Sequence, residues 1–117
     1  MIFSGSALRI EKIEDGLAHL QFDLPGESVN KLNLQLSGEL AQAVDALEKT
    51  PGIRGLLISS AKNVFIVGAD VMEFGPIFAQ GDEAIARHIQ SNNRTFNRLE
   101  DLPFPTVVAI NGYALGG

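Results

Sequence analysis

Two short glycine-containing segments hold the residues best placed to do chemistry. Val67-Gly68-Ala69-Asp70 follows an apolar segment, and residues 111–117 end in Gly116-Gly117 after an apolar run. Each is expected at the junction between a strand and a helix, where unpaired backbone N–H groups favour negative charge. Two such amides that converge could form an oxyanion hole without any particular side chain. Taken alone, each segment is a weak signal, and a tight turn that needs glycine for its dihedral angles is the simpler interpretation.

Other kinds of site lack the required spacing. Residues 112–117 do not fit G-x-G-x-x-G, and neither glycine segment is followed by Lys-Ser or Lys-Thr, which excludes a Rossmann fingerprint and a P-loop. His19 and His88 lack metal-ligand spacing and are expected on solvated faces, so no metal site is predicted. We expect Asp70 to cap a short helix. The absence of cysteine excludes disulfides and thiolate nucleophiles.

Composition limits the classes of function further. The chain has 117 residues, 9 Lys and Arg against 14 Asp and Glu, and a net charge of −5. This length predicts one domain at most, and an acidic chain without a basic block is a poor partner for nucleic acid or a membrane surface. No secretory signal or apolar run of about 20 residues is present. We therefore expect a cytoplasmic protein without membrane insertion.

The first half of the chain reads as a hairpin followed by a helix. Residues 7–13 and 17–24 alternate apolar and polar around Asp15-Gly16, which is a strong hairpin signal. Residues 33–49 carry an apolar stripe typical of an amphipathic helix, ended by residues 50–52. The stripe consists of Leu36, Leu40, Ala43, Val44 and Leu47.

The second half alternates strands and helices. Residues 53–59 and 106–110 are predicted to be strands buried on both faces, and residues 82–99 a helix with an apolar stripe. A short helix from Asp70 to Phe74 is expected to be interrupted by Gly75-Pro76. This order predicts a layered α/β fold. The last strand has no following element to cover it, so we expect the chain to be the N-terminal piece of a longer protein.

Four segments together resemble the crotonase (enoyl-CoA hydratase/isomerase) family. They are residues 25–32, 65–70, 98–106 and 111–117, which read PGESVNKL, FIVGAD, RLEDLPFPT and NGYALGG. The resemblance spans essentially the whole chain and is closest to the N-terminal hydratase part of the alpha subunits of bacterial multifunctional fatty acid oxidation complexes. It implies an α/β fold of repeated β-β-α units, of which residues 1–117 would form the N-terminal portion.

The resemblance also implies a binding site for an acyl-CoA thioester. The family holds the thioester carbonyl with two backbone amides, which correspond here to Ala69 and Gly117. Substrate-binding positions would be Val29, Asn30, Lys31, Gly68, Asp70 and Gly116. Coenzyme A would arrive as part of the substrate, so the hydratase step would need no cofactor. NAD would serve only a downstream dehydrogenase domain, and a thiolase beta subunit would be the partner in the complex.

One part of the family's machinery is not in this sequence. The two glutamates that act as general acid and base in the family lie beyond the position of Gly117, so no catalytic side chain is assigned here. We expect the activity to belong to the longer protein and residues 1–117 alone to be inactive. Two alternatives remain: a non-catalytic crotonase-fold module used for binding or assembly, and an unrelated α/β domain whose glycines only make turns.

Overall fold

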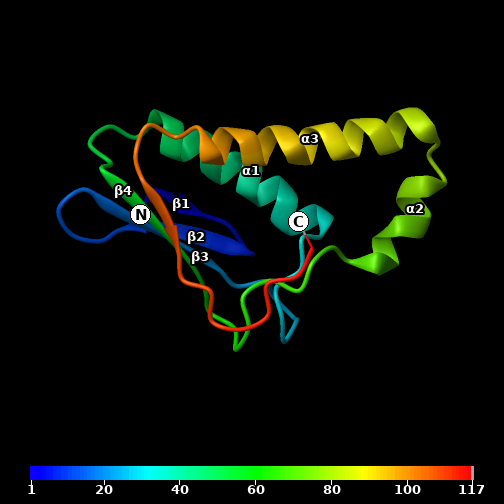
Figure 1. Cartoon of the computed structure of the whole chain (residues 1–117), viewed down its shortest axis with the longest axis horizontal. Helices are drawn as coiled ribbons and strands as arrows, with labels where there is room; N and C mark the ends of the chain where they lie inside the picture. Colours follow the sequence, from blue (N-terminus) through cyan, green and yellow to red (C-terminus); the bar gives the residue numbers. More distant parts are fainter. Residues whose placement is uncertain (117) are drawn as a thin grey trace.

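A single five-stranded sheet organises the protein, whose computed structural model describes residues 1–116. Its strands follow chain order: β1 (Phe3–Ser4), β2 (Leu8–Lys12), β3 (Leu17–Phe22), β4 (Gly55–Ser60) and β5 (Thr106–Val108). The pairs β1/β2 and β2/β3 are antiparallel, whereas β3/β4 and β4/β5 are parallel. The parallel pairs require crossovers, and the helices provide them (Figure 1).

The predicted hairpin joins β2 to β3. Asp15 and Gly16 both have positive φ, 54° and 81°, as a two-residue hairpin turn requires. Leu17 N–H donates to the Glu14 carbonyl at 3.0 Å and closes the turn. The expected alternation is confirmed, because Ala18, Leu20, Phe22 and Leu24 are buried. β1 was not predicted.

Two long helices cover one side of the sheet. α1 (Leu34–Lys49) begins at Asn33, whose side chain accepts from Leu36 N–H at 2.8 Å. Its buried residues are those of the predicted stripe, Leu36, Leu40, Ala43, Val44 and Leu47. α3 (Asp82–Glu100) runs on the same side of the sheet (Figure 1). The core lies between this helical layer and the sheet.

A short helical segment lies between β4 and α3. The 3₁₀ turn η1 (Val71–Glu73) is capped by Asp70, whose Oδ1 accepts from Met72 N–H at 3.0 Å, as predicted. α2 (Phe74–Phe78) follows directly. The predicted interruption at Gly75-Pro76 is wrong, because Pro76 lies in the first turn of α2. The N–H that proline lacks has no partner within the helix at that position.

β5 differs from the prediction of a strand buried on both faces. All three of its residues are exposed, with Val107 at 62% and Val108 at 41%. In β4, Leu56 and Ile58 are buried but Leu57 is only half-buried. The physical reason is that β5 is an edge strand and that, within residues 1–116, long helices cover only one side of the sheet. None of the helices in these residues is long and apolar enough to cross a membrane.

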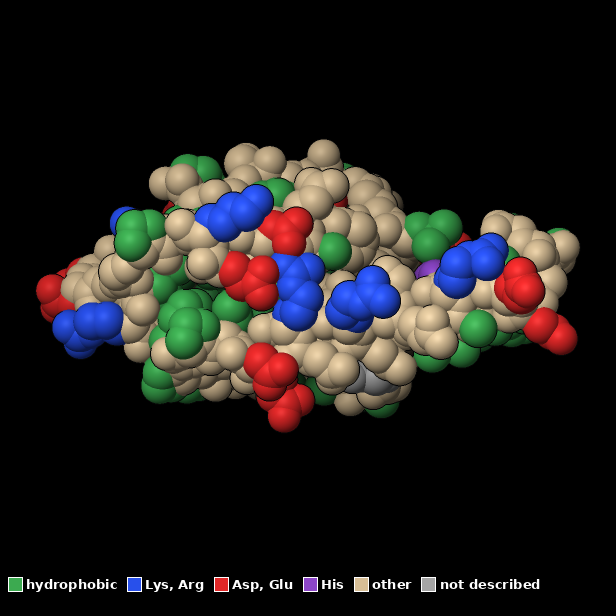
Figure 2. Space-filling view, turned by 90° about the horizontal axis from the view of Figure 1, so that it is seen from above, with side chains coloured by type: hydrophobic (Ala, Val, Ile, Leu, Met, Phe, Trp, Pro, Cys, Tyr) green, Lys and Arg blue, Asp and Glu red, His purple; other side chains and the backbone are tan. Residues whose placement is uncertain are grey.

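Charged side chains link the two long helices at the surface. The Arg98 guanidinium on α3 donates to Asp45 and, at 2.6 Å, to Glu48, both on α1. The hydrogen bond from Arg98 lowers the pKa of the Glu48 carboxyl below its ordinary value, and these carboxylates raise the pKa of Arg98. Figure 2 shows basic and acidic side chains interspersed over this helical face.

Candidate functional site

The two glycine-containing segments of the sequence lie side by side in the structure. Ile66, before the first segment, forms a parallel bridge with Ala114 in the second. Ile66 N–H donates to the Tyr113 carbonyl at 3.1 Å, and Leu115 N–H donates to the Ile66 carbonyl at 2.9 Å. Segments that are about 45 residues apart in the chain are thus held together by their backbones.

A third segment, residues 30–32, lies along the other side of the first turn. Leu32 forms a parallel bridge with Ala69, and its N–H donates to the Gly68 carbonyl at 2.8 Å. Val67 N–H donates to the Asn30 carbonyl at 3.0 Å. Residues 30–32, which include the predicted substrate-binding positions Asn30 and Lys31, and the two glycine turns therefore form one continuous backbone platform.

Gly68 and Gly116 allow the two turns to touch. Their φ angles, +96° and +72°, lie in the left-handed region that favours glycine. A Cβ on Gly116 would lie 3.2 Å from the Gly68 Cα, and a Cβ on Gly68 would lie 3.4 Å from the Leu115 carbonyl oxygen. Side chains at these positions would push the turns apart.

The Ala69 amide stands at this junction. Ala69 is exposed, and within residues 1–116 no backbone or side-chain acceptor bonds its N–H. Gly117, the other predicted amide donor, lies outside the described residues. The structure therefore gives a position for the first predicted donor and brings Gly116, the neighbour of the second, against the first turn.

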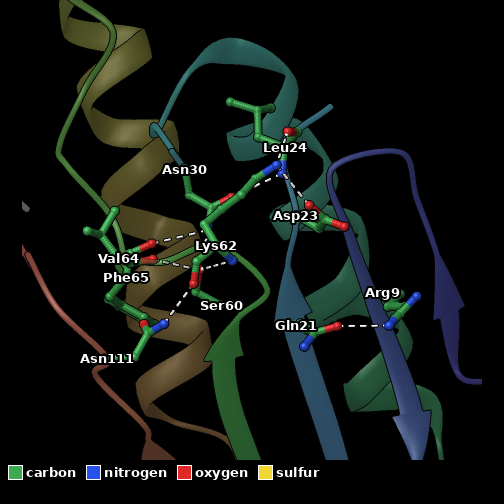
Figure 3. Close-up of polar contacts among 10 residues, drawn as sticks. All are labelled: Arg9, Gln21, Asp23, Leu24, Asn30, Ser60, Lys62, Val64, Phe65 and Asn111. Atoms are coloured by element: carbon green, nitrogen blue, oxygen red, sulfur yellow. Dashed lines mark hydrogen bonds and ion pairs between the residues drawn. The ribbon is translucent and has the colours of Figure 1, made fainter. Parts of the chain in front are cut away.

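Asn30 anchors the platform from within. Its buried side chain accepts from Leu24 N–H at 3.0 Å and donates to Ser60 Oγ at 2.8 Å and to the Phe65 carbonyl at 3.1 Å (Figure 3). Both amide hydrogens and the amide oxygen are engaged. The predicted ligand contact of Asn30 therefore cannot come from its side-chain polar atoms, which hold the loop in place.

Lys62 provides a second anchor that the sequence did not indicate. Its Nζ donates to the Leu24 carbonyl at 2.8 Å and lies 2.9 Å from Asp23 Oδ1. The Lys62 carbonyl accepts from Asn111 Nδ2 at 2.8 Å, which ties the second glycine segment to the same cluster (Figure 3). These partners are far apart in the chain, so no local pattern could have found them.

The other predicted binding residues lie around the platform. Val29 and Lys31 are half-buried, and the Lys31 ammonium lies 3.5 Å from Glu27 Oε2. Asp70 is occupied as the cap of η1, as the capping interpretation predicted. No group of three His, Asp or Glu residues within residues 1–116 is arranged to hold a metal ion.

Two cavities adjoin the platform. One, of about 240 Å³, lies at the second turn and is lined mainly by core side chains, with Gly116 at its wall. The other, of about 400 Å³, lies between α2 and α3. It is lined by Leu32, Ala69, Phe74, Ile77, Phe78, Ile85, His88, Ile89, Asn92, Asn93 and Phe96. His88, which we expected on a solvated face, is half-buried and lines this groove.

Comparison with known proteins decides the family. Residues 12–117, most of the chain, match the family described as "Enoyl-CoA hydratase/isomerase". The chain belongs to this family. The expected resemblance is thereby confirmed, and the glycine turns of the platform lie within the matched region.

Relatives of known name agree on a narrower group. The protein named "Fatty acid oxidation complex subunit alpha" from Psychrobacter cryohalolentis is 46% identical to this chain, and the one from Acinetobacter baylyi is 47% identical. Both alignments cover all 117 residues. The chain spans only 16% of the length of each of these relatives.

Solved structures confirm the predicted α/β crotonase fold. An enoyl-CoA hydratase/carnithine racemase from Magnetospirillum magneticum superposes with a TM-score of 0.85 at 24% identity, covering 97% of this chain and 42% of that one. An enoyl-CoA hydratase/isomerase from Xanthobacter autotrophicus Py2 gives a TM-score of 0.75 at 27% identity, covering 92% of this chain and 39% of that one.

Proposed function

We propose that these residues form the carbonyl-holding half of an enoyl-CoA hydratase/isomerase site. In this proposal, residues 1–117 are the N-terminal part of that domain in a multifunctional fatty acid β-oxidation protein. The observation that carries the proposal is the meeting of the two glycine turns, with the Ala69 N–H unbonded by any described residue. Membership of the family and the identity to the alpha subunits support it.

The proposed chemistry uses the backbone. The Ala69 and Gly117 N–H groups donate to the carbonyl oxygen of an acyl-CoA thioester. As water adds across the adjacent double bond, negative charge develops on that oxygen in the enolate. Amides already aimed at it stabilise this charge without reorganising, and each such donor contributes about 3–4 kcal/mol. The amides perform no proton transfer, so the general acid and base come from residues outside this chain.

The surrounding residues position the thioester. In the proposal, Val29, Asn30 and Lys31 border the coenzyme A portion, with Asn30 acting through its buried anchor rather than by direct polar contact. Gly68 and Gly116 leave the backbone open to close approach, and Asp70 fixes the turn that presents Ala69. The proposed hydratase step needs no cofactor. We extend the proposal to an NAD-dependent dehydrogenase domain and a thiolase beta subunit partner in the larger protein.

Substitution at Ala69 tests the role of its amide in the full-length protein that carries this segment. Ala69→Gly and Ala69→Ser keep the N–H and should retain much of the activity. Ala69→Pro removes the donor and should lower kcat for crotonyl-CoA hydration about 100-fold or more. Circular dichroism of each variant checks that it is folded.

The outcomes separate the proposal from its alternatives. Comparable turnover by the folded proline variant contradicts the oxyanion role. A full-length protein that binds acyl-CoA but hydrates none contradicts the hydratase and leaves the non-catalytic binding module. Failure to bind acyl-CoA at all contradicts the proposed thioester site.

A further inference from the structure

The groove between α2 and α3 leads away from Ala69 along an apolar wall. The N-terminal half of α3 extends past the end of α1, and α2 lies beside it there (Figure 1). The rings of Phe74 and Phe78 stack with centroids 5.6 Å apart, and both line the groove. Ile85 and Ile89 line it from α3. A volume of about 400 Å³ is typical of a small-molecule site.

One end of this groove lies next to the platform formed by residues 30–32 and the two glycine turns. Leu32, which pairs with Ala69, and Phe96 line both this groove and the cavity beside Gly116. Phe96 therefore marks the end nearest the two glycine turns. Since Ala69 lines the groove as well, a thioester held by the Ala69 amide has its acyl chain at the entrance.

Hydrogen-bonding side chains interrupt the apolar wall partway along. Phe96, Asn92 and His88 follow each other at four-residue spacing and share one face of α3. At 1.5 Å of rise per residue, Asn92 lies about 6 Å and His88 about 12 Å beyond Phe96. Ile85 continues the wall further out. Along this face of α3, an alkyl chain that leaves Ala69 thus meets Phe96, then Asn92 and His88, and then Ile85. Asn93 and Ile89 line the groove beside this row.

Among residues 1–116, His88 and Asn92 find only one weak side-chain hydrogen bond, and it joins them to each other. His88 Nε2 and Asn92 Nδ2 are 3.5 Å apart, at the limit of a hydrogen bond. Both side chains are half-buried, so they remain accessible to solvent. An alkyl chain laid over them displaces the solvent and offers nothing in return, which is unfavourable for binding.

We propose that His88 and Asn92 determine the acyl chain length that the site prefers. Short chains end before the pair, whereas long saturated chains must cover it. The inference rests on the proposed function, because it takes the occupant of the groove to be the alkyl chain of the acyl-CoA substrate. The pair acts on specificity and takes no part in the chemical step.

The test replaces the pair by apolar residues of similar size in the full-length protein. The His88→Leu/Asn92→Leu double variant is assayed with straight-chain trans-2-enoyl-CoA substrates from four to sixteen carbons. We expect the ratio of kcat/KM for the twelve-carbon substrate to that for the four-carbon substrate to rise about tenfold over the wild-type ratio. Each single variant should give a smaller rise.

Gln90→Leu is the matched control. Gln90 is exposed on the same helix and does not line the groove. It adds the same apolar side chain to α3 without changing the proposed pair, so the chain-length ratio should stay at the wild-type value. An unchanged ratio in both single variants and the double variant overturns the inference, as does an equal rise in Gln90→Leu.

Binding separates this inference from the proposed function. Calorimetric titration with saturated butanoyl-CoA and dodecanoyl-CoA measures the same preference without catalysis, and the double variant should favour dodecanoyl-CoA about tenfold more than wild type does. If wild type hydrates no substrate but this shift appears, the hydratase proposal fails and the role of the pair stands. If hydration is normal and no shift appears, the pair has no such role.

Discussion

The buried side-chain amide of Asn30 joins three chain segments by hydrogen bonds, as backbone hydrogen bonds join the strands of the sheet. Three segments, around Leu24, Ser60 and Phe65, converge at the ends of the paired strands β3 and β4. The amide has one acceptor and two donor hydrogens, and all three are used. A hydrogen bond contributes little net stability, but a buried group left without its partner is costly. The loop that borders the site is therefore fixed by one side chain.

Replacing Asn30 should destabilise the protein strongly. Asn30→Ala leaves the Leu24 N–H and the Phe65 carbonyl without partners, so we expect a loss of roughly 3 kcal/mol or more in the free energy of unfolding. Asn111→Ala is the control, because the side chain of that exposed residue makes a single hydrogen bond to the described part of the chain, and should lose less than about 1 kcal/mol. Urea denaturation of the full-length variants measures both. Equal losses would contradict the anchoring role of Asn30.

For single residues, interactions with near neighbours in the chain could be predicted, whereas contacts with residues far away in the sequence could not. The cap at Asp70 follows from residue type and a bond only two positions away, and it was predicted correctly. The family resemblance implied that Asn30 is a substrate-binding position. Its anchoring role could not be seen in the sequence, because its partners lie up to 35 residues away. His88 was expected on a solvated face because it lacks metal-ligand spacing. The sequence of its own helix does not show that α2 forms the opposite wall of a groove.

At the scale of elements, the site depends on two turns that have no room for side chains between them. Gly116 and Gly26 have nearly the same φ, +72° and +74°. A Cβ on Gly116 would contact the Gly68 backbone at 3.2 Å, whereas nothing lies within 4 Å of a Cβ on Gly26. The two glycines therefore share the same conformational strain and differ in what surrounds them.

This difference gives a matched pair of substitutions. Gly116→Ala should separate the turns by a few tenths of an ångström and misplace the amides, lowering kcat for crotonyl-CoA about tenfold or more, since small misplacements are costly in catalysis. Gly26→Ala should reduce stability by about 1 kcal/mol through its positive φ while kcat stays close to wild type. Steady-state kinetics and thermal unfolding measure the two effects. Similar kcat values in both variants would contradict the requirement for close contact.

The link between α1 and α3 predicts a dependence of stability on pH. Arg98 holds the pKa of Glu48 below its ordinary value of 4.5. The pair therefore stabilises the fold above about that pH, and the contribution is lost as the pH falls through the lowered pKa. Arg98→Gln should lower the unfolding midpoint slightly at pH 7, as expected for an exposed pair, and less at pH 3. An equal decrease at both values would show that the effect is not electrostatic.

The spacing of apolar residues predicted the elements that bury a single face. It failed for the strand whose burial depends on covering elements from elsewhere in the protein. The stripe of α1 and the Asp15-Gly16 hairpin are local signals, and both were confirmed. The apolar run of residues 106–110 predicted a strand buried on both faces, but β5 has exposed side chains throughout the described structure. The apolar residues of a segment show its tendency to be buried, but whether it is buried depends on other elements of the protein that pack over it.

At the scale of the whole molecule, the sheet carries an apolar edge that the described residues leave open. Val107 is 62% exposed, Ile110 is 59% exposed and Tyr113 is 67% exposed, all on or just after the edge strand β5. Burying one large apolar side chain contributes about 1.5–3 kcal/mol, against a net stability of about 5–15 kcal/mol for a typical domain. An edge strand with apolar side chains also invites pairing with another chain.

We therefore expect a polypeptide of these 117 residues alone to self-associate and to hydrate no crotonyl-CoA. Sedimentation should show species larger than a monomer, and near-UV circular dichroism should show weak tertiary packing. Val107→Lys places a charge on the edge strand and should reduce the association, because an edge lysine opposes strand pairing. Val71→Lys is the control, since Val71 is 68% exposed and belongs to η1 rather than to the edge strand, and it should leave the association unchanged. A monomeric, cooperatively folded and active polypeptide would contradict the importance of the open edge and the assignment of the general acid and base to residues outside this chain.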